Sequence, residues 1–256
     1  MILSLEDSAI SRPILVKGKY EQDVTEVLVK YLKDDIKFLD IGANLGYYSL
    51  LVASQCSNAK IYSFEPDQKN FHLFQTSVVY NQFQNSVCSY PLAVSDETKT
   101  IIISNLGNNG NFGARFTANS KQDLVDHIHG ENPYFQEIQA VSLDSFLPNL
   151  DIDIVKIDIE GHEPFAIQGM MGLLTRNKPI IFLEFAPSNL IQLGQINPRD
   201  FLKVFLELGY NFQVIVQQGE VVCYHTDLEQ LMTDFPSYKK HHLDLILTQV
   251  SLHEKK

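Results

Sequence analysis

Two acidic residues accompany a glycine-containing turn in the first third of the chain. The run Phe38-Leu39-Asp40-Ile41-Gly42-Ala43-Asn44-Leu45-Gly46 leads from an apolar strand into a loop and then into a helix. Glycine at the carboxyl end of a strand lets the backbone approach a ligand closely. Asp40 suits a cationic ligand with an amino group, and Glu65, at the predicted end of the next strand, can accept hydrogen bonds from both hydroxyls of a ribose. A capping role for Asp40 and a solvated strand-end position for Glu65 are the structural alternatives.

The loop departs from the fingerprint of dinucleotide-binding proteins. A Gly-x-Gly-x-x-Gly motif would need glycine at the positions of Asn44 and Tyr47, and the chain contains no Tyr-x-x-x-Lys pair. A nicotinamide-dependent Rossmann oxidoreductase therefore stays only as an alternative.

A second group of ionisable residues interrupts and follows the predicted strand 152–158. Lys156 and Asp158 are two residues apart and face the same side of the strand, so a mutual ion pair is one explanation. The functional explanation places Asp158, Glu160 and His162 at the carboxyl end of the strand, beside the ligand. His162 can act as a general base because imidazole titrates near neutral pH. A helix-start position without catalytic duty is the alternative for His162.

Three carboxylates near this strand also allow a different chemistry. Asp158, Glu160 and Glu184 stand at the ends of two predicted neighbouring strands and could supply oxygen ligands to a hard divalent ion. The sequence fixes no distances between these side chains, and the eight histidines show no zinc-like spacing. We therefore predict no metal, and keep a divalent-ion site as an alternative.

Alternating strands and helices must position these residues, which is typical of an α/β fold with a mostly parallel sheet covered on both faces. The sequence predicts strands at 36–41, 60–65, 87–94, 152–158 and 180–185, and helices at 47–53, 68–80, 164–174 and 198–208. Strands at 212–216, 221–224 and 243–247 around the turn 217–220 predict an antiparallel edge hairpin.

Residues 1–35 are expected to form an N-terminal arm and helix of the same domain, which residues 36–256 complete. An insertion at about 98–143 breaks the alternation. We expect it to contain strand segments at 98–103 and 137–143, a loop at 104–120 rich in glycine and asparagine, and a short helix at 122–127.

The charge and hydropathy of the chain disfavour two classes of partner, nucleic acids and membranes. The net charge of −11 disfavours binding to nucleic acid, whose protein partners carry basic stripes. The chain contains no apolar run long enough to span a membrane, and Glu6 and Asp7 stand where a signal peptide would be basic. We expect a cytoplasmic protein without a membrane partner. The oligomeric state is not predicted.

Six motifs, in order, resemble the FkbM family of methyltransferases. They are the glycine-loop run extended through Tyr47-Tyr48-Ser49, then Phe64-Glu65-Pro66, Leu92-Ala93-Val94-Ser95-Asp96, Val141-Ser142-Leu143-Asp144-Ser145-Phe146, Ile157-Asp158-Ile159-Glu160-Gly161-His162-Glu163, and Phe182-Leu183-Glu184-Phe185. The resemblance covers about residues 21–184. It implies a class I methyltransferase (Rossmann-like) fold with a seven-stranded sheet, S-adenosylmethionine as cofactor, and O-methylation in natural-product or saccharide pathways.

The resemblance also implies roles for individual residues. Asp40, Gly42, Asn44 and Gly46 would line the methionine part of the cofactor, Glu65 the ribose, and residues 93–95 the adenine edge. The full set of expected cofactor-binding residues is Glu21, Asp40, Gly42, Ala43, Asn44, Gly46, Tyr47, Glu65, Pro66, Ala93, Val94 and Asp158. Glu21 resembles an acidic position ahead of the family's glycine loop, with N-capping as the alternative.

The expected activity is methylation of a hydroxyl on a small-molecule or carrier-bound acceptor, with His162, Asp158 and Glu160 as catalytic residues. A methyl sulfonium is already a good electrophile, so the protein mainly has to align the acceptor and exclude water. A divalent-metal-assisted O-methyltransferase, the oxidoreductase and a non-catalytic binding module are the alternatives.

Overall fold

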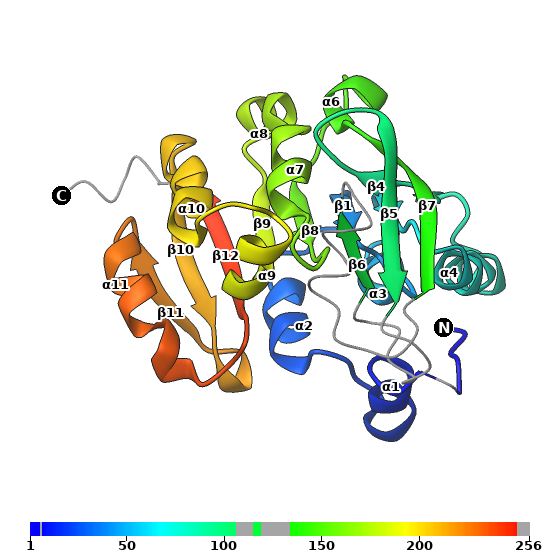
Figure 1. Cartoon of the computed structure of the whole chain (residues 1–256). Helices are drawn as coiled ribbons and strands as arrows, with labels where there is room; N and C mark the ends of the chain where they lie inside the picture. The colour runs from blue at the N-terminus through cyan, green and yellow to red at the C-terminus, as the bar shows by residue number, and fades with distance from the viewer. Residues whose placement is uncertain (6, 106–114, 119–133, 250–256) are drawn as a thin grey trace.

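A central eight-stranded sheet organises the computed structural model, which describes residues 1–5, 7–105, 115–118 and 134–249 (Figure 1). Its strand order is β11-β10-β12-β9-β8-β1-β2-β3. The strands are β1 (Lys37–Ile41), β2 (Lys60–Phe64), β3 (Val87–Tyr90), β8 (Ile154–Ile157), β9 (Ile180–Phe185), β10 (Tyr210–Ile215), β11 (Val221–His225) and β12 (Leu243–Gln249). Strands β3, β2, β1, β8 and β9 pair in parallel, whereas β12 is antiparallel to β9 and β10.

The mostly parallel sheet with an antiparallel edge is confirmed, but the predicted number of seven strands is wrong. β10 and β11 form the expected edge hairpin around the 3-10 turn η1 (Gln217–Gly219), and β11 is the eighth strand. Because β12 returns between β9 and β10, the hairpin is left at the edge of the sheet.

Helices cover both faces of the sheet, so both faces are buried. Because successive side chains of a strand point to opposite sides, each strand contributes residues to both cores. In β1, Phe38 packs into one core and Leu39 into the other. The first core contains helices α2 (Gln22–Val29), α3 (Tyr47–Gln55) and α4 (Gln68–Tyr80). The second core contains α7 (Glu163–Gln168), α8 (Met171–Asn177), α9 (Pro187–Gln192), α10 (Pro198–Glu207) and α11 (Leu228–Asp234). Helix α1 (Ser11–Lys17) precedes both groups, and none of the helices in the described ranges is long and apolar enough to cross a membrane.

The inserted region, with the short strand that precedes it, builds a second, four-stranded sheet of order β4-β7-β5-β6, which is drawn across the β1 part of the main sheet in Figure 1. Its strands are β4 (Ala93–Val94), β5 (Lys99–Asn105), β6 (Arg115–Ala118) and β7 (Tyr134–Val141), and the short α6 (Leu143–Phe146) follows. The single strand predicted at 87–94 is therefore wrong: it divides at Pro91, and its last two residues pair with β7.

The prediction of one long loop at 104–120 is also wrong in part, because this range contains the end of β5 and all of β6. The helix expected at 122–127 lies outside the described residues.

One predicted helix is divided in two, at a break that the local sequence pattern does not indicate. The helix expected at 164–174 is divided into α7 and α8 near Gly169, and a Cβ atom on Gly169 would lie 1.9 Å from the backbone oxygen of Ser95. This close approach brings the start of the inserted region against α7. Helices α9 and α11 were not predicted.

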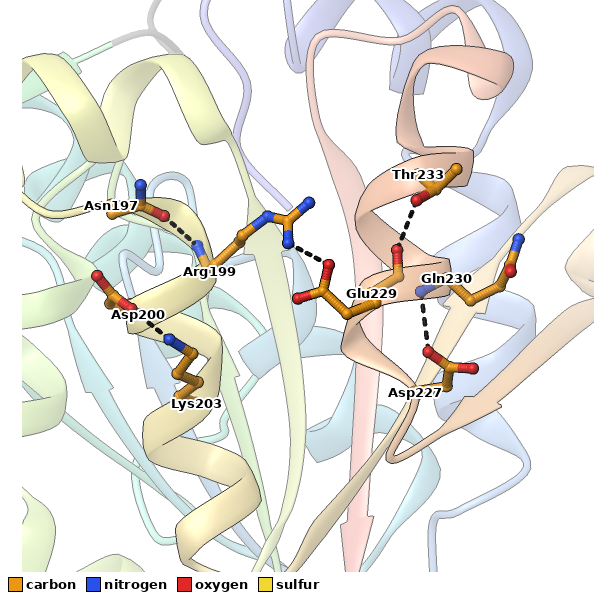
Figure 2. A network of polar contacts seen from close by, with 8 residues as sticks. All are labelled: Asn197, Arg199, Asp200, Lys203, Asp227, Glu229, Gln230 and Thr233. Carbon is orange, nitrogen blue, oxygen red and sulfur yellow. Dashed lines mark hydrogen bonds and ion pairs between the residues drawn. The ribbon is translucent and has the colours of Figure 1, made fainter.

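Surface polar contacts join α10 to α11 at the far end of the sheet (Figure 2). Asn197 caps α10 by accepting from the backbone nitrogen of Arg199 at 2.9 Å, and Asp227 caps α11 by accepting from that of Gln230 at 2.9 Å. Figure 2 shows the Arg199 side chain reaching from α10 to the Glu229 carboxylate on α11, with which it forms an ion pair. Both side chains are well exposed, so this pair contributes little to stability.

Candidate active site

Two neighbouring cavities open at the carboxyl ends of the parallel strands. Cavity A, together with its mouth that is open to solvent, encloses about 510 Å³ of empty space. It is lined by Ile41, Gly42, Asn44, Phe64, Glu65, Pro66, Leu92, Ala93, Val94, Ile103, Thr117, Asp158, Ile159, Glu160 and His162. Cavity B, together with its mouth that is open to solvent, encloses about 1040 Å³ of empty space. It is lined by Ala9, Ile10, Tyr20, Glu21, Gly42, Ala43, Asn44, Leu45, Tyr47, Tyr48, Lys156, Asp158, Glu160, Glu184, Ala186, Ser188, Asn189, His241 and His242. Gly42, Asn44, Asp158 and Glu160 line both cavities and mark their junction.

The glycine loop is held in place by close packing and by the neighbouring strand. Gly42 has a φ of +84°, and a Cβ atom there would lie 1.9 Å from the backbone oxygen of Asp158. Gly46 has a φ of +80°, and its Cβ would lie 2.0 Å from the ring of Phe74. Only glycine combines this backbone conformation with such contacts. Both glycines therefore have a structural role, and Gly42 also lines the cavities.

Asp40 lies below the cavities. Its side chain is buried, and one carboxylate oxygen accepts a hydrogen bond from the Ser49 hydroxyl at 2.5 Å. Burial raises the pKa of Asp40 to about 6, against the opposing effects of Ser49 and the Lys156 charge. Asp40 and Gly46 are not among the residues that line the two cavities, so the structure does not bring these two expected cofactor residues to the cavity surface.

Glu65 connects the second strand to the glycine loop. One of its carboxylate oxygens accepts from the backbone nitrogen of Asn44 at 2.8 Å, and the other accepts from that of Asp67 at 2.9 Å. The side chain is only 5% exposed and lines cavity A, where Pro66, Ala93 and Val94 also lie. The structure therefore brings the expected ribose and adenine residues together.

The expected residues Glu21, Ala43 and Tyr47 line cavity B. Glu21 precedes α2 and has a φ of +40°, and its carboxylate accepts a hydrogen bond from the Tyr48 hydroxyl at 2.6 Å. Its side chain makes no capping hydrogen bond to α2 within the described part of the chain. Glu21 thus faces the cavity, and Tyr48 is a lining residue that the sequence did not single out.

Lys156 and Asp158 form the ion pair that their spacing allowed, with a distance of 2.9 Å between Nζ and Oδ2. The Lys156 side chain is only 8% exposed, and its ammonium lies 4.8 Å from the centre of the Tyr48 ring. Although burial opposes the charged form, the surrounding carboxylates raise the pKa of Lys156 above its ordinary value. Lys156 therefore carries a positive charge inside cavity B.

Carboxyl groups crowd around this charge. Burial and the nearby Asp158 charge raise the pKa of Glu160 to about 8, and the same two causes raise that of Glu184 well above its ordinary value. Glu160 also accepts a hydrogen bond from the Asn189 amide at 2.9 Å.

The carboxylates expected as the alternative metal set are grouped differently from the prediction. Ligand atoms of Glu21, Asp158 and Glu184 lie within 4.8 Å of one another, and Glu160 is not part of that group. The Lys156 ammonium already supplies a positive charge at Asp158. A metal-free site stays our prediction.

His162 lies in the wall of cavity A and is 1% exposed. Its Nε2 atom is 3.0 Å from the Ser95 hydroxyl, and its ring packs against Phe165 with 4.8 Å between centroids. Burial and the Lys99 charge lower the pKa of His162 to about 4. The imidazole is therefore neutral at physiological pH and a weak base.

Comparison with known proteins assigns the family. The model of the methyltransferase FkbM domain matches residues 40–212. The chain belongs to this family. The resemblance found in the sequence is thus confirmed, and five of the six motifs of this FkbM-domain chain contribute residues to the cavity walls, whereas the motif at 141–146 lies at the end of β7 and in α6.

A solved FkbM methyltransferase shows the same fold. The FkbM methyltransferase of Methylobacillus flagellatus KT aligns with a TM-score of 0.51 and 14% identity, over 85% of this chain and 45% of that one. The FkbM-domain chain thus spans less than half the length of that protein. A precorrin-6y C5,15-methyltransferase of Geobacter metallireducens GS-15 aligns with a TM-score of 0.49 and 13% identity, over 91% and 90% of the two chains. No curated protein matches the chain significantly.

Thr117 and Tyr48 are examples of lining residues that were not among the expected site residues. Thr117 comes from β6 of the inserted sheet, and Tyr48 from the first turn of α3. Tyr48 stands beside the glycine loop, so its position in the sequence carried a signal. Thr117 lies in a stretch without periodicity and gave none. The side chain of Arg115, two residues earlier, is outside the described part of the structure.

Proposed function

We propose that this protein is an S-adenosylmethionine-dependent O-methyltransferase that acts on a hydroxyl of a small molecule, such as a natural product or saccharide, free or carrier-bound. The observation that carries the proposal is the junction of two cavities at Asp158 and Glu160. A cofactor in cavity A would present its reactive group to an acceptor in cavity B at this junction.

The residues of cavity A fit the adenosine half of the cofactor. Leu92, Ala93, Val94 and Ile103 offer an apolar surface to a flat base, and the Glu65 carboxylate stands at the carboxyl end of β2, where ribose hydroxyls are bound in related folds. Glu21 and Asp158 would face the ammonium group of the methionine half in cavity B.

S-adenosylmethionine supplies an electrophilic methyl group, so the protein has to orient the acceptor, exclude water and remove a proton. Glu160 is suited to the last task, because a carboxyl with a pKa of about 8 is a stronger base when ionised than an ordinary glutamate. Asn189 orients the Glu160 carboxylate through its 2.9 Å hydrogen bond. Asp158 is fixed by Lys156 at 2.9 Å, which keeps a negative charge beside the position of the sulfonium.

The general-base role expected for His162 has less support. Its neutral ring lines cavity A, whereas the acceptor side of the site is cavity B. A group with a pKa of about 4 also removes protons poorly. Asp158 and Glu160 are therefore the catalytic residues we retain.

Methyl transfer from labelled S-adenosylmethionine into a panel of hydroxylated small molecules and saccharides tests the proposal. With a labelled acceptor in hand, Glu160→Gln should lower kcat by about 10²-fold or more while the binding of S-adenosylhomocysteine stays within threefold. Glu137→Gln, on the exposed face of β7, is the matched control. Equal loss of kcat in both variants, or no loss in either, would contradict the role of Glu160.

A further inference from the structure

Two buried polar atoms in the wall of cavity A have no hydrogen-bond partner within the described part of the chain. They are His162 Nδ1 and Thr117 Oγ1. The two residues are 1% and 6% exposed, and both line the cavity. Buried polar atoms are nearly always satisfied, so a pair of them in one cavity wall indicates a ligand that satisfies both.

The hydrogen-bond network behind His162 determines what its Nδ1 atom can do. Lys99 forms an ion pair with Asp96 at 2.6 Å, and the Ser95 hydroxyl lies 2.8 Å from the same Asp96 oxygen. Burial favours the protonated form of Asp96, but the hydrogen bonds from Lys99 and Ser95 outweigh it and lower its pKa. Asp96 is therefore an ionised acceptor, and the single hydroxyl proton of Ser95 is donated to it.

Ser95 can then only accept from His162. At 3.0 Å, His162 Nε2 must carry the proton and donate it to Ser95 Oγ. In a neutral ring the other nitrogen, Nδ1, is an acceptor. The lowered pKa of His162 agrees with this neutral form. Cavity A therefore holds a fixed acceptor, set by a relay that begins at Lys99 in the inserted sheet.

Thr117 complements this acceptor. Its hydroxyl can donate or accept, and it lies on β6, so the inserted sheet brings it to the cavity. The apolar residues Ala93, Val94 and Ile103 line the same cavity. A ligand part that fits is flat and apolar on its faces, with a donor and an acceptor on one edge.

We propose that His162 and Thr117 read the edge of the adenine base of the cofactor, with His162 Nδ1 accepting from the exocyclic 6-amino group and the Thr117 hydroxyl donating to a ring nitrogen. This inference rests on the proposed function, since it concerns the same cofactor. It makes His162 a specificity residue for the base, and it gives the inserted sheet a role in cofactor binding.

S-inosylhomocysteine, whose base is hypoxanthine instead of adenine, is the discriminating probe. It carries a 6-oxo group in place of the 6-amino group, and two acceptors would then face each other at His162. Leaving a buried polar group unsatisfied typically weakens binding by about ten- to a hundredfold. By calorimetry, the wild-type protein should bind S-adenosylhomocysteine at least tenfold more tightly than S-inosylhomocysteine.

Two matched substitutions distinguish the contributions of the two ring nitrogens of His162 to binding. Asn carries its terminal oxygen on Cγ, as His carries Nδ1, so His162→Asn keeps an acceptor near that position. Gln places its terminal atoms one bond further, at the level of Nε2, so His162→Gln keeps only the contact with Ser95. The tenfold preference for adenine should survive in the Asn variant and fall below threefold in the Gln variant.

Thr117 supplies a second, isosteric test. Thr117→Val should weaken the binding of S-adenosylhomocysteine about tenfold, whereas Thr117→Ser should leave this affinity unchanged. Thr117→Val should also leave the Tm of the free protein unchanged or higher, because it removes an unsatisfied buried hydroxyl. A merely structural role would lower the Tm and leave the affinity unchanged.

The outcomes are distinguishable. If the wild-type protein binds neither S-adenosylhomocysteine nor S-adenosylmethionine, the proposed function fails. If it binds the adenine and hypoxanthine compounds equally, or if His162→Gln and His162→Asn have the same preference, the assignment of His162 is overturned while the proposed function stands. If either His162 variant is unfolded by circular dichroism, the Thr117 pair decides, and equal affinities in the Val and Ser variants overturn the inference.

Discussion

Replacement of Lys156 by methionine should strongly destabilise the protein. The ion pair with Asp158 has a distance of 2.9 Å, and the two side chains are 8% and 22% exposed. Removing one partner of a buried pair costs about 3–5 kcal/mol, because the remaining charge is left uncompensated. Since Asp158 keeps some contact with water, we expect a loss of about 2–4 kcal/mol in the free energy of unfolding, and a fall in Tm of roughly 4–16 °C.

The chain offers a matched control for this measurement. Lys33 forms an ion pair of the same 2.9 Å length with Asp153, but the side chains are 55% and 34% exposed. Lys33→Met should therefore cost less than about 1 kcal/mol. Urea unfolding followed by circular dichroism at pH 7 measures both variants.

A double substitution tests the cause. The double variant Lys156→Met with Asp158→Asn contains neither charge of the pair. Its loss in free energy of unfolding should therefore be about 2 kcal/mol smaller than the sum of the losses of the two single variants. Equal losses in the Lys156→Met and Lys33→Met variants, or strict additivity in the double variant, would refute the view that a buried charge pair supports cavity B.

Three further changes have expected outcomes. Gly42→Ala should cost about 3 kcal/mol or more in urea unfolding, because its Cβ would lie 1.9 Å from the Asp158 backbone oxygen at a φ of +84°; a loss below 1 kcal/mol would disprove this packing. Burial raises the pKa of Glu163 from 4.5 to about 7, so the native form holds a proton that the unfolded chain releases, and stability should fall by about 3 kcal/mol as the pH rises from 4.5 to 7. Glu163→Gln should flatten this part of the pH profile of urea unfolding, and an unchanged profile would contradict the assignment. Arg199→Ala breaks the exposed ion pair with Glu229 and should change the Tm by no more than about 4 °C, so a larger shift in a thermal melt would show that α10 and α11 depend on it.

The sequence predicted the parts of the site that follow from strand ends. Parallel strands present their carboxyl ends at one edge, so Glu65 after β2 and Asp158 after β8 had to approach the loop after β1. The spacing of two between Lys156 and Asp158 placed both side chains on one face, which allowed an ion pair as one of two explanations, and the pair is present. These inferences need only periodicity and the topology of an α/β sheet.

Other features depend on contacts between distant segments. His162 was predicted as a base, but its neighbour Ser95 is 67 residues away and determines the orientation of the ring. Asp40 was predicted at the cavity, but Ser49 and Ser63 hold its surroundings together below the loop. The direction of each side chain follows from the packing of α3 and of the inserted sheet, which local pattern does not determine.

Binding of the cofactor product tests the central claim most directly. Titration of the wild-type protein with S-adenosylhomocysteine in a calorimeter should show saturable 1:1 binding. Glu65→Ala should weaken it at least tenfold, since Glu65 lines cavity A and anchors Asn44 of the glycine loop. Absence of heat with S-adenosylhomocysteine and S-adenosylmethionine, together with saturable binding of NAD, would contradict the account.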